Sequence, residues 1–130
     1  MYALDTNTFI HALKGVGHVR RRLVLTGPAD IAIPAIALYE LTYGTLRSSN
    51  PQKRQAELDR LLSLLTVLPF DGHAANSAAR IRLDLERGGM QIGPLDTLIA
   101  GTVLAYGAIL VTHNVDKFSR VAGLQIEDWY

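Results

Sequence analysis

Three isolated carboxylates carry the strongest chemical signal in this 130-residue sequence. Asp5 follows the apolar residues 2–4, Glu40 interrupts the apolar segment 31–41, and Asp96 begins a long uncharged stretch. A carboxylate in such surroundings costs free energy unless it is solvated, hydrogen-bonded or bound to a cation. If the three converge on one crevice, they predict a divalent-metal site.

The elements that must position these acids alternate between short apolar strands and helices. The expected strands are residues 2–4, 31–33, 66–69, 108–112 and 125–126, and the expected helices are residues 6–14, 18–25, 34–43, 51–65, 73–87 and 94–106. Strands alternating with helices imply right-handed crossovers and a mainly parallel sheet. The sequence therefore predicts an α/β sandwich, and the length favours a single domain over residues 1–130.

The candidate site residues fall at one edge of this predicted sheet. Ligands of an open parallel sheet collect beyond the carboxyl ends of its strands. Asp5 lies there directly, and Asn114 and Asp116 follow a later strand. Glu40 is placed to lean back over the same rim from its helix. Asp96 falls in the first turn of its helix, where the macrodipole stabilises a carboxylate.

Each acid also has a purely structural explanation. A cap on the helix that begins at Thr6 would account for Asp5 without any metal. A first-turn position in a helix would account for Asp96 in the same way. Glu40 is harder to explain, because it lies inside an otherwise apolar segment.

The ligand types narrow the choice of metal. Carboxylates that share a pocket repel one another, and a hard cation removes that repulsion. The chain contains no cysteine and no pair of histidines at zinc-like spacing. Oxygen ligands of this kind favour Mg²⁺, with Mn²⁺ as a substitute, over Zn²⁺. Such ions activate water and polarise phosphoryl oxygens, which predicts phosphate chemistry.

Composition excludes several other classes of protein. The hydrophobic content of 48% argues against disorder, and the net charge of +1 gives no strong nucleic-acid signal. No Walker loop, GxGxxG or GxSxG motif occurs. The uncharged stretch 97–112 is shorter than a membrane span, so we expect no membrane association. The absence of cysteine fits a cytoplasmic protein.

Four motifs make the chain similar to a known family. They are Leu4–Asn7, Ala37–Leu41, Gly93–Ala100, and Val111–Asn114 with Phe118. In this order they resemble the PIN-domain ribonucleases, and more closely the VapC toxins of bacterial VapBC toxin–antitoxin modules. The likeness spans essentially the whole chain. It implies a three-layer α/β/α PIN-like domain with a mainly parallel central sheet, Mg²⁺ dependence, and endonucleolytic cleavage of RNA.

The resemblance also assigns roles by position. It makes Asp5 and Asp96 the principal metal ligands and Glu40 the third acid, which binds directly or through a water. Thr6 and Thr112 match polar residues that support these ligands.

One departure from the family pattern affects the fourth position of the site. Many PIN domains carry an acid where this chain has Asn114. An amide cannot supply the missing charge, although its carbonyl can accept hydrogen bonds from metal-bound water. Asp116 is the other candidate for this position. We therefore expect one firmly held Mg²⁺.

The resemblance further implies a substrate and partners. The closing segment looks most like the VapC subgroup that cuts initiator tRNA in its anticodon loop. Arg80, Arg82 and Arg87 are candidates to hold the RNA backbone. The implied partner is a VapB-type antitoxin, in a homodimer and a hetero-oligomer with that antitoxin. One helix face is either its landing surface, a homodimer seam or ordinary core, and it consists of Leu58, Leu61, Leu62 and Leu65.

Two other functions compete with an RNA endonuclease toxin. A phospho-receiver domain also has an acidic Mg²⁺ pocket, but Asp5 has no acidic neighbour and residues 64–69 contain no acid. A catalytically silent PIN-like module that only binds protein or RNA is the second alternative, and Asn114 is the reason to consider it.

Overall fold

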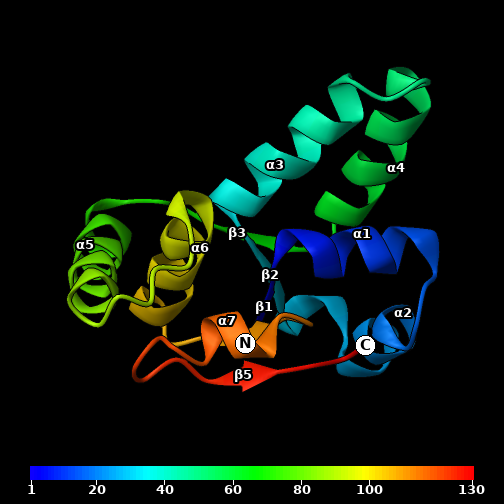
Figure 1. Cartoon of the computed structure of the whole chain (residues 1–130). Helices are drawn as coiled ribbons and strands as arrows, with labels where there is room; N and C mark the ends of the chain where they lie inside the picture. The colour runs from blue at the N-terminus through cyan, green and yellow to red at the C-terminus, as the bar shows by residue number, and fades with distance from the viewer.

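The computed structural model describes all 130 residues and is built around a five-stranded sheet (Figure 1). Its strands are β1 (Tyr2–Leu4), β2 (Ile31–Pro34), β3 (Thr66–Leu68), β4 (Ile109–Val111) and β5 (Ile126–Glu127). Their order is β3-β2-β1-β4-β5, and every neighbouring pair is parallel. Because β1 is the central strand, the residue that follows it lies at the centre of the carboxyl edge.

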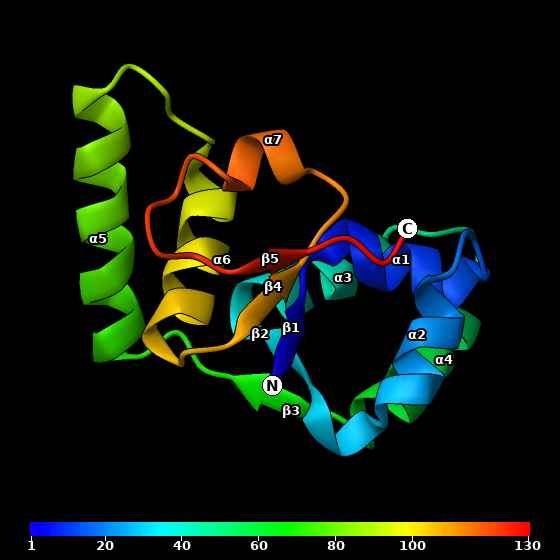
Figure 2. The ribbon, with the colours of Figure 1, turned by 90° about the horizontal axis from the view of Figure 1, so that it is seen from below.

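Helices cover the sheet on both sides. They are α1 (Thr6–Lys14), α2 (Val19–Thr26), α3 (Ala35–Leu46), α4 (Pro51–Leu62), α5 (Gly72–Arg87), α6 (Pro94–Ala105) and α7 (Val115–Phe118), with a 3₁₀ turn at Pro28–Asp30. Figures 1 and 2 show α1 and α2 on one side of the sheet and α5 and α6 on the other, while α3 and α4 project as a helical hairpin. The predicted α/β/α fold with a parallel central sheet is confirmed. None of these helices combines the length and apolar content needed to cross a membrane.

Polar side chains fix the starts of three helices. Asp5, Asn50 and Asp71 each accept a hydrogen bond from the backbone N–H three residues further on, at 2.9, 3.3 and 3.0 Å. Such caps satisfy donors that have no partner inside the helix. Pro51 and Pro94 occupy first-turn positions, where a missing N–H has no consequence.

The structure differs from the sequence prediction at three places. α3 continues through Gly44 to Leu46, because Gly44 keeps a negative φ and does not end the helix. α4 ends at Leu62 rather than at residue 65, where the chain tightens into consecutive turns. The short helix α7 was not predicted, since four residues are too few to show a helical period.

One hydrophobic core of 25 buried residues joins the strands to helices from both sides. Leu58 is 1% exposed, and Leu61, Leu62 and Leu65 pack against this core. Leu58 therefore belongs to the core and Leu61, Leu62 and Leu65 are partly buried against it, whereas Leu64 is exposed. On the opposite side of the sheet, α5 and α6 pack closely, because a Cβ added at Gly101 would lie 2.6 Å from Ala78.

Candidate active site

Asp5 is a buried carboxylate at the carboxyl end of the central strand. Its side chain is held by three hydrogen bonds: Oδ1 accepts from Thr8 N at 2.9 Å and from Thr8 Oγ1 at 2.6 Å, and Oδ2 accepts from Thr112 Oγ1 at 2.6 Å. The residue is 7% exposed, and it forms no ion pair. Asp5 therefore has a fixed orientation and no cationic partner from the protein.

Thr112 connects Asp5 to the loop after β4. Its hydroxyl is completely buried, donates to Asp5, and accepts from the backbone N–H of Asn114 at 3.0 Å. Thr112 therefore contacts Asp5 directly, and its supporting role in a metal site stays a prediction. The side chains of Asn114 and Asp116 are exposed, and the Asp116 carboxylate forms no hydrogen bond or ion pair. The structure thus brings the backbone of Asn114, rather than its amide group, to the Asp5 cluster.

Glu40 reaches the same edge of the sheet from α3. Its Oε1 accepts a hydrogen bond from Thr6 Oγ1 at 2.7 Å, across 34 residues of sequence. Thr6 is the first residue of α1 and follows Asp5 directly. Glu40, like Asp5, forms no ion pair. Asp5 and Glu40 are therefore linked through the adjacent residue Thr6, whose supporting role in a metal site stays a prediction.

Asp96 differs from the other two acids because it has a cationic partner. Lys117 Nζ lies 2.9 Å from Asp96 Oδ2, and each side chain is about one third exposed (33% and 32%). Lys117 comes from α7 and Asp96 from the first turn of α6. In this structure the cation beside Asp96 is the Lys117 ammonium group, whereas the sequence analysis predicted a metal ion there.

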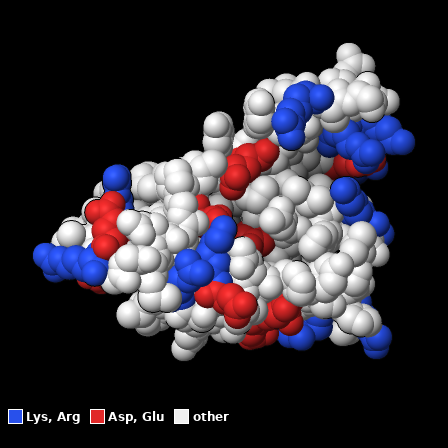
Figure 3. All heavy atoms as spheres, viewed as in Figure 1, with Lys and Arg blue, Asp and Glu red and all other residues white.

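The donor atoms of the three acids are of the type that binds a hard divalent cation. All their donors are oxygens, and two of the three carboxylates have no positive partner. The face shown in Figure 3 has acidic atoms gathered near its middle, with basic side chains beside them and towards both ends. As positioned here, no three Asp, Glu, His or Cys side chains form a group that could hold one metal ion. The acids are linked to Thr112, Thr6 and Lys117 rather than to one another.

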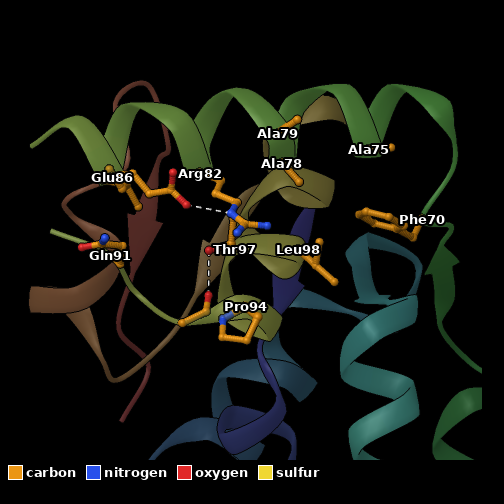
Figure 4. Close-up of a pocket in the computed structure, with 12 residues that line it drawn as sticks. Phe70, Ala75, Ala78, Ala79, Arg82, Glu86, Gln91, Pro94, Thr97 and Leu98 are labelled. Atoms are coloured by element: carbon orange, nitrogen blue, oxygen red, sulfur yellow. Dashed lines mark hydrogen bonds and ion pairs between the residues drawn. The ribbon is translucent and has the colours of Figure 1, made fainter. Parts of the chain in front are cut away.

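The predicted RNA-binding arginines lie on or beside α5. Arg80 Nε donates to Asn76 at 2.8 Å, and Arg82 Nε pairs with Glu86 at 2.8 Å. Figure 4 shows Arg82 extending from α5 towards α6 over a groove of about 630 Å³ whose floor is largely apolar. Arg87 is the last residue of α5. None of these arginines forms an ion pair with Asp5, Glu40 or Asp96.

Two residues of the site lie outside the sequence prediction. Thr8 is the third residue after a capping Asp, and this position alone identifies the backbone N–H that a cap binds. From this position, the hydroxyl of Thr8 could also have been predicted to contact Asp5. Lys117 gave no such signal, because it lies on a helix that the sequence pattern did not predict.

Comparison with known proteins places this geometry in a family. The PIN domain family model matches residues 2–124. A tRNA(fMet)-specific endonuclease VapC from Salmonella typhimurium is 39% identical over 129 residues, which are 98% of this chain and 97% of the relative. Ribonuclease VapC2 from Rickettsia felis is 34% identical over 131 residues, covering 99% of this chain and 98% of the relative.

Solved structures agree with these relatives. The crystal structure of DNA-bound VapBC from Salmonella typhimurium contains a chain that superposes with a TM-score of 0.93 at 38% identity, covering 99% of this chain and 98% of that one. VapBC2 from Rickettsia felis, bound to a DNA fragment from its promoter, gives a TM-score of 0.92 at 35% identity, with the same coverage. The chain therefore belongs to the PIN-domain family and, within it, to the VapC ribonucleases.

Proposed function

We propose that this chain is a Mg²⁺-dependent endoribonuclease that acts in the cytoplasm as the toxin of a toxin–antitoxin pair. One observation carries the proposal: Asp5 is buried at the end of the central strand, held by three hydrogen bonds, and lacks any cationic partner. A buried carboxylate in this state is suited to receive a cation. The single core of residues 1–130 supports their action as one domain.

Asp5, Glu40 and Asp96 would hold the cation, with Glu40 acting directly or through a water. When bound, Mg²⁺ supplies a polarised phosphoryl oxygen and an activated water. Thr112 and Thr8 fix the two oxygens of Asp5, so this carboxylate needs little reorganisation when a ligand arrives.

The remaining residues near the edge support the acids. Thr6 orients Glu40 from the position next to Asp5. Asn114 and Asp116 are the candidates for the fourth position, and both are exposed at the start of α7.

Lys117 has two successive roles in this proposal. It neutralises Asp96 when no metal ion is bound. If Asp96 held a divalent cation, the Lys117 ammonium group would be free at the edge of the site and could contact an RNA phosphate as a point charge.

The relatives support initiator tRNA as the substrate and a VapB-type antitoxin as the partner. One is named as an endonuclease specific for tRNA(fMet), and the structural neighbours are VapBC complexes. We propose the anticodon loop as the cleaved region and a homodimer that joins the antitoxin in a hetero-oligomer. Arg80, Arg82 and Arg87 would hold the RNA backbone, giving an affinity that falls steeply with salt.

The test incubates the purified chain with initiator tRNA, an elongator tRNA and total RNA, in Mg²⁺ and in EDTA. We expect Mg²⁺-dependent cuts mapped to the anticodon loop of initiator tRNA, which are lost in Asp5→Asn and Asp96→Asn. Cleavage that survives EDTA and both substitutions would contradict the metal-dependent mechanism. Specific RNA binding without any cleavage would instead favour the silent binding module.

A further inference from the structure

Three aromatic rings meet beside the acidic edge, from segments far apart in the sequence. The rings of His113 and Tyr130 are stacked, with centroids 4.2 Å apart and planes inclined by 30°. The ring of His11, on α1, lies 4.8 Å from the same tyrosine in a tilted arrangement. None of these contacts has a place in the metal chemistry described above.

Asp128 holds the stacked pair in position. Its Oδ2 lies 3.0 Å from His113 Nδ1, and its Oδ1 accepts the backbone N–H of Tyr130 at 2.9 Å. One carboxylate thus fixes the imidazole and the backbone that carries the second ring. Gly17 provides the space, because an added Cβ would lie 3.2 Å from Tyr130 O and 3.5 Å from its ring.

The stack remains open to solvent although its neighbours are buried. The His113 side chain is 57% exposed and Tyr130 is 44% exposed, whereas Trp129 is 2% exposed. Trp129 packs 5.2 Å from the ring of Tyr2, which already anchors this segment to the sheet. Anchoring therefore does not account for two exposed rings held face to face.

The location gives the stack a relation to the acids. His113 directly follows Thr112, whose hydroxyl binds Asp5. A ligand ring lying on the stack would therefore sit beside the proposed metal centre. Arg22 lies 5.0 Å from the ring of Trp129, the residue before Tyr130, and its charge is paired with Glu127.

We propose that the His113–Tyr130 stack binds an unpaired RNA base next to the phosphate that the acids cleave. Single-stranded bases are held by stacking on aromatic side chains, including Tyr and His. This inference rests on the proposed nuclease function, because it takes the nucleic acid to be RNA and the acids to act on its backbone. Asp128 and Gly17 act as positioning residues for the two rings.

The test measures binding without cleavage, so it remains informative if the nuclease proposal fails. Asp5→Asn protein in EDTA is titrated into a fluorescently labelled anticodon stem-loop RNA, and fluorescence anisotropy gives Kd. A matched set of RNAs carries an abasic nucleotide at each loop position in turn. Adding His113→Ala or Tyr130→Ala should weaken binding of the intact RNA about 10-fold. One abasic RNA, the one that lacks the base held by the stack, should bind the alanine variants and the parent protein with the same Kd.

The controls separate stacking from charge and from folding. Tyr130→Phe keeps an aromatic ring and should recover the RNA binding that Tyr130→Ala loses. His113→Phe keeps a ring but lacks the Nδ1 contact with Asp128, so it should recover binding only in part. Thermal melting shows whether each alanine variant is folded. Equal weakening for intact and abasic RNAs, or no weakening in folded variants, would overturn the base-binding site. If the alanine variants bind RNA like the parent protein but no longer bind a VapB-type antitoxin, the base-binding site is also overturned. The stack would then belong to the surface that contacts the protein partner.

Discussion

Asp5 and Asp71 each begin a helix and accept the N–H three residues further on, at 2.9 and 3.0 Å. Each also accepts hydroxyl hydrogen bonds from elsewhere in the fold, Asp5 from Thr112 and Asp71 from Tyr106. Their surroundings are opposite. Asp5 is buried at the end of the central strand, whereas Asp71 is partly exposed at the outer α5–α6 pair. Capping is therefore common to both, and burial without a cation distinguishes the candidate catalytic acid.

The exposed pair shows what a hydroxyl does to such a carboxylate. The hydrogen bond from Tyr106 lowers the pKa of Asp71, with help from the backbone N–H of Ala74. The same bond raises the pKa of Tyr106. At Asp71 this interaction joins the start of α5 to the end of α6.

The largest expected effect is on stability at Asp5. Asp5→Ala removes a cap and leaves the buried Thr112 hydroxyl without its acceptor, so we expect a loss of about 3 kcal/mol. Asp71→Ala removes a cap at a more exposed position and should cost less. Urea unfolding of both variants measures the difference. Equal losses would mean that burial adds nothing at Asp5.

The next effect tests the hydroxyl that holds Asp5. Thr112→Val keeps the shape of the side chain but removes both of its hydrogen bonds, and we expect a loss of about 1–2 kcal/mol by urea unfolding. Thr112→Ser retains the hydroxyl and serves as the matched control. If the two variants are equally stable, the bond to Asp5 contributes no stability.

A smaller change in stability is expected at Lys117, together with a gain in metal affinity. Lys117→Met breaks a partly exposed ion pair, so unfolding should change by less than about 0.5 kcal/mol. Mg²⁺ should bind more tightly, because a competing cation has been removed from Asp96. Isothermal titration calorimetry measures this affinity, with Lys53→Met on the distant α4 as the control. Unchanged or weaker Mg²⁺ binding would contradict the proposed exchange of cations.

The smallest effect is a pH dependence at the exposed pair. The folded-state pKa of Asp71 is lowered, so its bond contributes above the unfolded value of about 3.9 and is lost as pH falls through the folded pKa. The folded-state pKa of Tyr106 is raised, so the contribution is present below about 10 and is lost as pH rises through the folded pKa.

Tyr106→Phe removes the hydroxyl from this pair. The stability difference between the parent protein and this variant should be widest between these limits and should shrink at both extremes. Urea unfolding across the pH range measures it, and a difference that does not vary with pH would remove Tyr106 as the partner of Asp71.

The position of Asp5 after a buried strand was predictable from sequence, but its partners were not. Asp5 follows an apolar run, which is enough to place it at the end of a buried strand. The sequence left a helix cap and a metal ligand as alternatives, and the structure shows that Asp5 does cap α1. Its contact with Thr112 spans 107 residues, and no local pattern reports such a contact.

The pairing of Lys117 with Asp96 and the stacking of His113 on Tyr130 could not be predicted from sequence either. Lys117 lies on a four-residue helix without a readable period, so nothing marked it as the partner of an acid 21 residues away. The stack of His113 on Tyr130 depends on how residues 127–130 fold back beside α1. Side-chain pairing across elements is decided by tertiary packing, which periodicity does not encode.

The most direct test compares Asp5→Asn with Asp71→Asn, because both substitutions keep a capping oxygen and remove one negative charge. Mg²⁺ binding is measured by isothermal titration calorimetry on folded protein, and cleavage of initiator tRNA is measured in parallel. We predict that Asp71→Asn binds Mg²⁺ and cleaves RNA like the parent protein, whereas Asp5→Asn loses both Mg²⁺ binding and cleavage. Folded Asp5→Asn protein that binds Mg²⁺ and cleaves RNA at the parent rate would contradict the central role of Asp5.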